Sequence, residues 1–163
     1  MKLRMLLLLS LAIAFVAFSA APNALALTWT ETIDGDLSDA HGAPTFLALD
    51  PGVNTVSGTM GTPPGGPLDA DIFTFTIGAG EALVGFDLTA LVPSSPLGTG
   101  SFLALSSGTS ISSSNPSLHL GAALIPGPAD LLTSLGTTFG GSGFTSPLGP
   151  GDYTFWIQET ATT

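Results

Sequence analysis

The sequence predicts an all-β fold, a sandwich or barrel of short strands that follows an N-terminal signal peptide. Short segments alternate apolar and polar residues with the period of a strand. Twenty-one glycines and thirteen prolines, with many Ser and Thr residues, separate these segments, and this punctuation is typical of all-β domains. The first 26 residues differ, because a basic start is followed by an apolar run and a small-residue site.

The N-terminal segment has the three parts of a secretory signal. Lys2 and Arg4 form the basic part, residues 5–21 are almost entirely apolar, and Ala24-Leu25-Ala26 supplies small residues at the cleavage site. An uncleaved membrane anchor is the alternative, but a bilayer span needs about 20 apolar residues, and Pro22 interrupts this run. We therefore expect a signal peptide over residues 1–26 and one secreted domain over residues 27–163, with no membrane attachment after cleavage.

The charge of the predicted domain limits its partners. Lys2 and Arg4 are the only Lys or Arg residues and leave with the signal, so residues 27–163 keep all 12 acidic groups and a formal charge of −12. Such a chain cannot neutralise phosphates, which excludes nucleic acid, and it has no polybasic patch for anionic lipid. It contains no Cys, so no disulfide stabilises the fold.

The strands are predicted from period-two patterns. Residues 71–77 are the clearest, with Phe73, Phe75 and Ile77 on one face. Residues 82–88 are expected to pair antiparallel with them across the turn 78–80. Further strands are expected at residues 28–33, 54–60, 101–106, 117–123 and 153–158. For residues 128–135, a short helix, a strand and a loop all stay open.

Two segments resemble the bacterial pre-peptidase C-terminal domain. Residues 69–80 read DADIFTFTIGAG and are similar to that family's D-x-D-x-[FY]-x-F-x-(apolar)-x-A-G pattern, and residues 149–155 (GPGDYTF) are similar to its G-x-G-x-Y strand. The match covers most of residues 28–159. The resemblance implies an antiparallel jelly-roll-like β-sandwich that serves as an accessory binding module. The family usually adds a closing strand ending in an aromatic residue, so we expect a domain that lacks its last strand.

The acidic residues near this motif admit two interpretations. Asp69 and Asp71 are two apart, so on a strand both carboxylates point one way, about 6.6–7 Å apart. The resemblance implies calcium bound through an N-terminal acidic segment and this region. The candidate ligands are Glu31, Asp34, Asp36, Asp39, Asp69 and Asp71. The other interpretation is that these residues form Asx turns and keep a strand edge soluble, which requires no cofactor.

No catalytic constellation is evident in the sequence. His41 is expected in a turn and His119 on a strand pointing outward, and two distant histidines do not make a zinc site. The chain has no G-x-S-x-G elbow and, once processed, no Lys or Arg to stabilise an anionic transition state. We therefore expect that it is not an enzyme. Trp156 is interpreted either as a sugar-stacking platform or as part of a second core layer.

These observations lead to three functional hypotheses. The first is a secreted, non-catalytic module with a binding or structural role at the cell surface or in the extracellular matrix. The alternative is a calcium-dependent module that binds carbohydrate or matrix, and the third is a hydrolase whose site has no recognised motif. The expected partners are extracellular polysaccharide or matrix protein.

Overall fold

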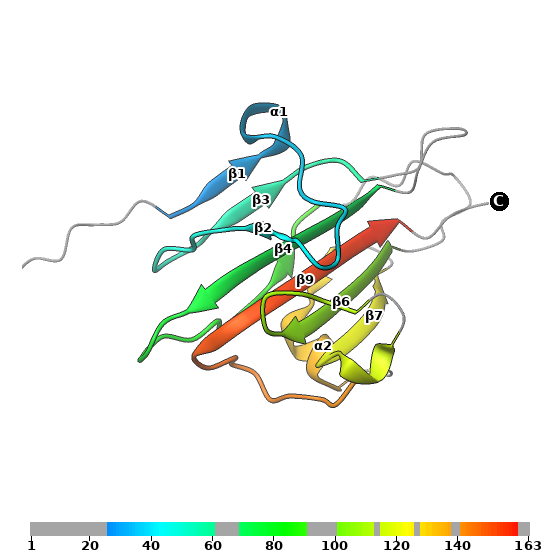
Figure 1. Cartoon of the computed structure of the whole chain (residues 1–163). Helices are drawn as coiled ribbons and strands as arrows, with labels where there is room; N and C mark the ends of the chain where they lie inside the picture. The colour runs from blue at the N-terminus through cyan, green and yellow to red at the C-terminus, as the bar shows by residue number, and fades with distance from the viewer. Residues whose placement is uncertain are drawn as a thin grey trace, which may run out of the picture.

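The computed structural model describes residues 26–60, 69–90, 101–112, 115–125, 128–137 and 141–159 (Figure 1). The predicted signal peptide therefore lies outside the described residues, except for Ala26. The elements in chain order are β1 (Thr28–Thr30), α1 (Glu31–Asp34), β2 (Thr45–Phe46), β3 (Thr55–Ser57), β4 (Ala70–Ile77), β5 (Asp87–Leu88), β6 (Ser101–Ser107), the 3₁₀ turn η1 (Pro116–Leu118), β7 (Gly121–Ile125), β8 (Ala129–Asp130), α2 (Leu132–Thr137) and β9 (Gly151–Glu159). Most of this regular structure is strand, arranged in open sheets, which agrees with the expected all-β class.

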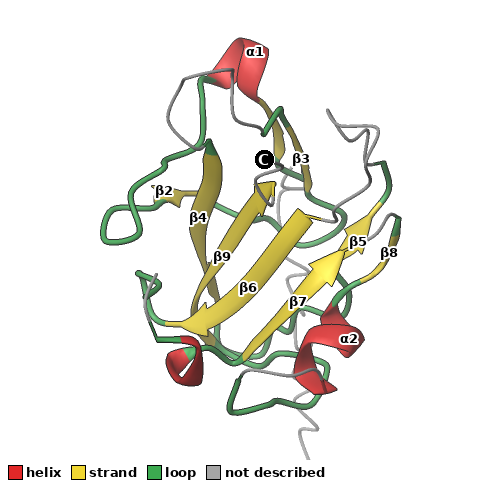
Figure 2. Ribbon diagram, turned by 90° about the vertical axis from the view of Figure 1, so that its right-hand side faces the viewer, coloured by secondary structure: helices red, strands yellow, loops and turns green. Residues whose placement is uncertain are grey.

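The largest sheet has the strand order β2-β4-β9-β6-β7, and Figure 2 shows β4, β9, β6 and β7 side by side. β4 and β9 run antiparallel with Phe73 opposite Phe155. The predicted pairing of residues 71–77 with 82–88 is wrong, because β9 occupies that edge of β4 along its whole length. The aromatic residues of β9 meet those of β4, whereas residues 82–88 form only the short strand β5.

Two smaller sheets accompany the large one. β1 pairs with β3, and β5 pairs with β8. The expectation of a wholly antiparallel fold is wrong in two places, since β1 runs parallel to β3 and β2 runs parallel to β4. Both parallel pairs lie in the N-terminal part of the chain, where long connections let a strand return in the same direction.

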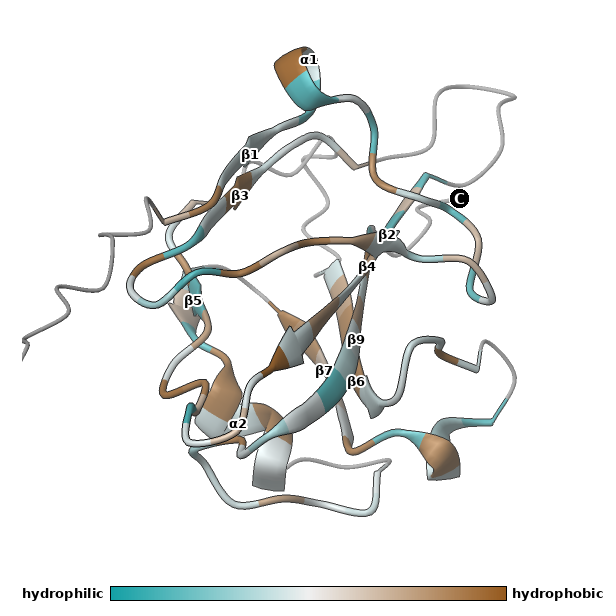
Figure 3. Ribbon diagram, turned by 60° about the vertical axis from the view of Figure 1, so that its left-hand side comes forward, coloured by the Kyte–Doolittle hydropathy of each residue, from teal (hydrophilic) through white to brown (hydrophobic). Residues whose placement is uncertain are grey.

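One face of the large sheet carries the main core. Phe73, Phe75 and Phe155 are buried there, and Phe155 stacks on Phe86 with ring centroids 4.2 Å apart. Trp29 of β1 packs against the edge of the same cluster. Figure 3 colours each residue by hydropathy and places α2 beside the large sheet. Leu132 and Leu135 of α2 are fully buried in this core.

The opposite face of the large sheet is also covered. Ile72, Ala104 and Ile111 are buried together on this side, with Trp156 packed against them. Thr74 of β4 is buried on this side as well and donates its hydroxyl to the Tyr153 carbonyl at 2.9 Å. β4 is therefore a central strand with two buried faces.

Other strand boundaries differ from the prediction. Residues 28–33 divide into β1 and the single turn α1, and only Thr55–Ser57 form a strand within residues 54–60. Within 117–123, η1 comes first and β7 begins at Gly121. The open segment 128–135 contains both β8 and the start of α2, whose Leu132 amide is capped by Asp130 Oδ1 at 3.1 Å. Among the described residues, no helix is long and apolar enough to cross a bilayer.

Candidate metal centre

Asp71 is an ionisable residue on a buried strand. It lies near the start of β4, and 7% of its surface is exposed. Its Oδ1 atom is buried and has no hydrogen-bond partner. A buried carboxylate without a partner is unfavourable unless it is neutralised by a proton or a cation.

Glu31 reaches Asp71 from the N-terminal part of the chain. The pairing of β1 with β3 sets Thr30 opposite Ser57, so Glu31, the first residue of α1, lies beside Gly58 and Thr59. Its Oε2 atom accepts the Thr59 amide at 2.7 Å, whereas Oε1 is buried without a partner. A Cβ atom at Gly58 would collide with this carboxylate, so the absence of a side chain there makes room for Glu31.

Asp36 completes the group from the segment that follows α1. The next residue, Leu37, is buried in the core, and Ser38 forms an isolated bridge with Ile72 of β4. These contacts anchor the segment beside β4, while Asp36 itself stays exposed to solvent.

The three carboxylates are close enough to bind one ion. One oxygen from each of Glu31, Asp36 and Asp71 lies within 4.8 Å of the others. Oxygens bound to one Ca²⁺ at 2.3–2.6 Å can be at most about 5 Å apart. The set contains only hard oxygen ligands, which suit Ca²⁺ or Mg²⁺ better than zinc or copper. Because Asp36 is exposed, an ion held there would face solvent on one side, and water could complete its coordination.

The electrostatics of Asp71 reflect this crowding. The pKa of Asp71 is raised from 3.8 to about 8, first by burial and then by the charge of Glu31 and a hydrogen bond to it. The charges of Asp69 and Asp36 act in the same direction. When both groups are ionised the facing oxygens have no partner, so the hydrogen bond between them requires a proton on Asp71. A divalent cation would replace that proton.

The other predicted ligands are not part of the group of three converging carboxylates. Asp34 accepts the Thr30 amide at 2.7 Å and so closes the turn of α1. Asp39 accepts the Ala70 amide at 2.9 Å and caps the start of β4. Asp69 is not among the three converging carboxylates, although its charge acts on Asp71. The turn interpretation thus describes Asp34 and Asp39, and the cluster contains Glu31, Asp36 and Asp71.

The two histidines lie near each other, contrary to the expectation that they are distant. The rings of His41 and His119 approach Trp156 edge-on, with centroids 4.4 and 6.4 Å from the indole. The pKa of His41 is lowered, first by burial and then by the charge of His119. The outward orientation predicted for His119 is also wrong, because its side chain is buried while Leu118 is exposed.

Trp156 is half-buried in the second core layer. Besides the two histidines it contacts Phe102 at 4.7 Å, and its Nε1 donates to Gln158 Oε1 at 3.2 Å. These surroundings fit the core interpretation, and a sugar platform at Trp156 stays a prediction. The sequence did not predict that His41 and His119 meet at Trp156, because their spacing along the chain does not show which residues are close in the fold.

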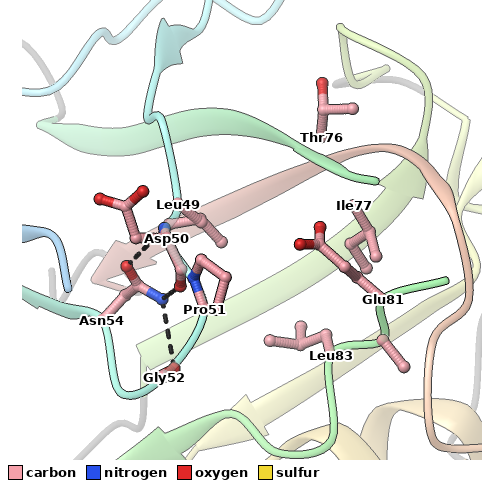
Figure 4. Close-up of a pocket in the computed structure, with 10 residues that line it drawn as sticks. Leu49, Asp50, Pro51, Gly52, Asn54, Thr76, Ile77, Glu81 and Leu83 are labelled. Atoms are coloured by element: carbon pink, nitrogen blue, oxygen red, sulfur yellow. Dashed lines mark hydrogen bonds between the residues drawn. The ribbon is translucent and has the colours of Figure 1, made fainter. Parts of the chain in front are cut away.

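A separate cleft of about 280 Å³ lies between residues 49–54 and the turn after β4 (Figure 4). Asn54 closes one side by donating to the carbonyls of Asp50 and Gly52. On the other side Glu81 accepts the Gly78 amide at 3.0 Å. None of its lining residues has a buried side-chain atom without a partner. The acidic cluster is therefore the better candidate for a functional site.

Comparison of this chain with family models, curated proteins and solved structures gave no match.

Proposed function

We propose that this protein is an exported, non-catalytic β-sandwich module that binds one Ca²⁺ through Glu31, Asp36 and Asp71. The observation that carries the proposal is that Asp71 Oδ1 and Glu31 Oε1 are both buried without a donor, in carboxylates that converge with Asp36 to within 4.8 Å. The predicted mature chain contains no Lys or Arg, so no side-chain ammonium or guanidinium of its own can neutralise them. A bound cation is the remaining way to keep both groups ionised in the interior.

The jelly-roll-like architecture is part of the proposal. Coverage of both faces of the β2-β4-β9-β6-β7 sheet supports it. The sheets β1–β3 and β5–β8 would together form the second layer, with Trp29 and Leu88 packed against the main core. In this arrangement the ion joins the β1–β3 sheet to the large sheet, because Glu31 follows β1 and Asp71 lies in β4.

The proposed role is binding or structural, at the cell surface or in the extracellular matrix. The signal-peptide pattern of residues 1–26 supports export. The formal charge of −12 on residues 27–163 disfavours anionic ligands, so neutral polysaccharide or matrix protein is the proposed class of partner. The lack of Lys and Arg and of a recognised nucleophile motif supports a non-catalytic module.

Thermal melting of the processed chain tests the proposed ion site. Residues 27–163, stripped with EDTA, should gain stability with Ca²⁺, by about 2.7 kcal/mol at a free concentration about 100-fold above the dissociation constant. MgCl₂ at matched ionic strength should give a clearly smaller shift. An equal shift with NaCl at matched ionic strength would mean that charge screening alone acts, and would refute the site.

Two charge-matched variants separate the site from general electrostatics. Asp36→Asn removes a proposed ligand, while Asp87→Asn removes an equally exposed carboxylate on β5. We expect the calcium-dependent shift to be lost in Asp36→Asn and kept in Asp87→Asn. Equal calcium responses in the two variants would contradict the assignment.

A further inference from the structure

A second group of unsatisfied polar atoms lies on the opposite face of the large sheet from the main core. His41 Nε2, Ser106 Oγ and His119 Nδ1 are all buried and lack a hydrogen-bond partner. In the described part of the chain, the other such atoms are those of the acidic cluster and Trp29 Nε1. Buried polar groups are nearly always satisfied, so each of these exceptions calls for an explanation such as a bound water or ion.

The hydrogen bonding of His119 fixes which of its nitrogens is free. Its Nε2 atom lies 2.8 Å from the carbonyl oxygen of Ser112. A carbonyl can only accept, so Nε2 carries the hydrogen, and Nδ1 of the neutral ring presents a bare lone pair. A histidine that donates one N–H to a backbone carbonyl and offers the other nitrogen is the usual arrangement of a metal ligand.

The backbone ties the turn that carries His41 to the loop that His119 contacts. The His41 carbonyl accepts the Ile111 amide at 3.1 Å, which ties the turn of residues 41–42 to the loop that contains Ser112. The His41 ring stands at 80° to the plane of the Trp156 indole, and the His119 ring stands at 87° to it. Both imidazoles are therefore in T-shaped contact with the same indole.

A cleft reaches His41 and Ser106 from solvent, and the buried His119 bonds the carbonyl of Ser112, which also lines the cleft. The cleft measures about 390 Å³, and His41, Ser106, Ser110, Ser112 and Leu118 are among its lining residues. No carboxylate lines it. Its donor set is therefore imidazole and hydroxyl, in contrast to the all-carboxylate set of Glu31, Asp36 and Asp71.

We propose that His41, Ser106 and His119 form a second metal site, which takes a divalent first-row transition ion such as Cu²⁺, Ni²⁺ or Zn²⁺. Imidazole nitrogen is a preferred ligand of these ions and a poor ligand of Ca²⁺. Water in the cleft completes the coordination. The site is independent of the proposed calcium site, which lies among carboxylates and offers no nitrogen.

Quenching of Trp156 fluorescence by Cu²⁺ tests this site directly. The chain has two tryptophans, so Trp29→Phe leaves Trp156 as the only indole, in contact with both proposed ligands. Untagged residues 27–163 of this variant are titrated with Cu²⁺ in saturating Ca²⁺, which occupies the acidic cluster. We expect strong quenching that saturates at one Cu²⁺ per chain, is reversed by EDTA, and is suppressed by added Zn²⁺, which binds without quenching.

Two substitutions each remove one proposed ligand atom in this background. His119→Gln keeps an N–H donor for the Ser112 carbonyl and loses Nδ1, while His41→Asn loses Nε2. Each should weaken Cu²⁺ binding by at least about tenfold, since even outer-shell changes cost 10–100-fold. Asp87→Asn should leave the titration unchanged. If His119→Gln lowers the melting temperature, the half-buried His41→Asn variant still decides the question.

Absence of saturable quenching would overturn the proposal. Equal quenching in the histidine variants would overturn it too, because it would place the copper on surface carboxylates. Failure here leaves the calcium proposal standing. If Ca²⁺ does not bind, the histidine variants still decide whether the copper is held by His41 and His119.

Discussion

The carboxyl groups of Asp71 and Glu31 meet in the interior, although Asp71 lies in the central strand β4 and Glu31 begins α1. Both present an oxygen that has no hydrogen-bond partner when the two groups are ionised. The pair therefore needs either a proton or a cation, and the choice depends on pH and on the ions present.

The first prediction concerns pH in the absence of calcium. The pKa of Asp71 is raised from 3.8 to about 8 in the folded chain, so between these values the native state retains a proton that the unfolded state has lost. Stability must then fall as pH rises through this window. The melting temperature of the EDTA-treated chain should decrease from pH 5 to pH 8, the range over which this pKa acts.

The Asp71→Asn variant is the control for this pH dependence. Its amide cannot ionise, so the calcium-free variant should lose most of the decline between pH 5 and pH 8. Saturating Ca²⁺ should also reduce the decline in the original chain, because the ion stabilises the ionised form. A decline of the same size in Asp71→Asn would assign the pH dependence to other groups.

Gly58 should be intolerant of a side chain. A Cβ atom there collides with the Glu31 carboxylate, so Gly58→Ala should displace Glu31 from the Thr59 amide. We expect a loss of about 1–3 kcal/mol of unfolding free energy, the usual range for a charge-assisted hydrogen bond, together with weaker Ca²⁺ binding. Urea denaturation and calcium titration measure the two effects.

Gly42→Ala is the matched control for Gly58→Ala. Nothing lies within 4 Å of a Cβ atom at Gly42, and its φ angle is not in the left-handed region. This variant should be as stable as the original chain to within about 0.5 kcal/mol. If the two alanine variants behave alike, the close approach of Glu31 to Gly58 is not a feature of the folded protein.

Phe155 should be the most costly aromatic residue to truncate in β9. Its side chain is 1% exposed and contacts Phe73, Phe75 and Phe86. Phe155→Ala should cost about 3–5 kcal/mol, as is typical for buried phenylalanine. Leu124→Ala, at a side chain that is 66% exposed, should change stability by less than about 0.5 kcal/mol. Equal costs in urea denaturation would contradict the described packing.

The sequence predicted the long strands better than their partners. Residues 71–77, 101–106 and 153–158 all lie in strands, as expected, because alternation of apolar residues reports which side chains share a face. It does not report which strand lies alongside. The turn after Ile77 therefore predicted a local hairpin, whereas β4 pairs with the distant β9.

The sequence predicted which residues belong to the acidic region, but it did not predict which of them converge. Six acidic residues were named, and three converge, because α1 starts at Glu31 where a continued strand was expected. Asp34 and Asp39 instead satisfy backbone amides. The burial of His119 was missed because η1 ends at Leu118 and β7 begins only at Gly121, which reverses the side-chain direction expected from an unbroken strand.

Titration calorimetry of the EDTA-treated chain with Ca²⁺ measures directly whether the Asp71–Glu31 pair binds the ion. The processed chain should take up one Ca²⁺, and heat of binding should disappear in Asp71→Asn while it persists in Asp87→Asn. If Asp71→Asn bound Ca²⁺ with the same stoichiometry and affinity as the original chain, the buried acidic pair would not be a calcium ligand.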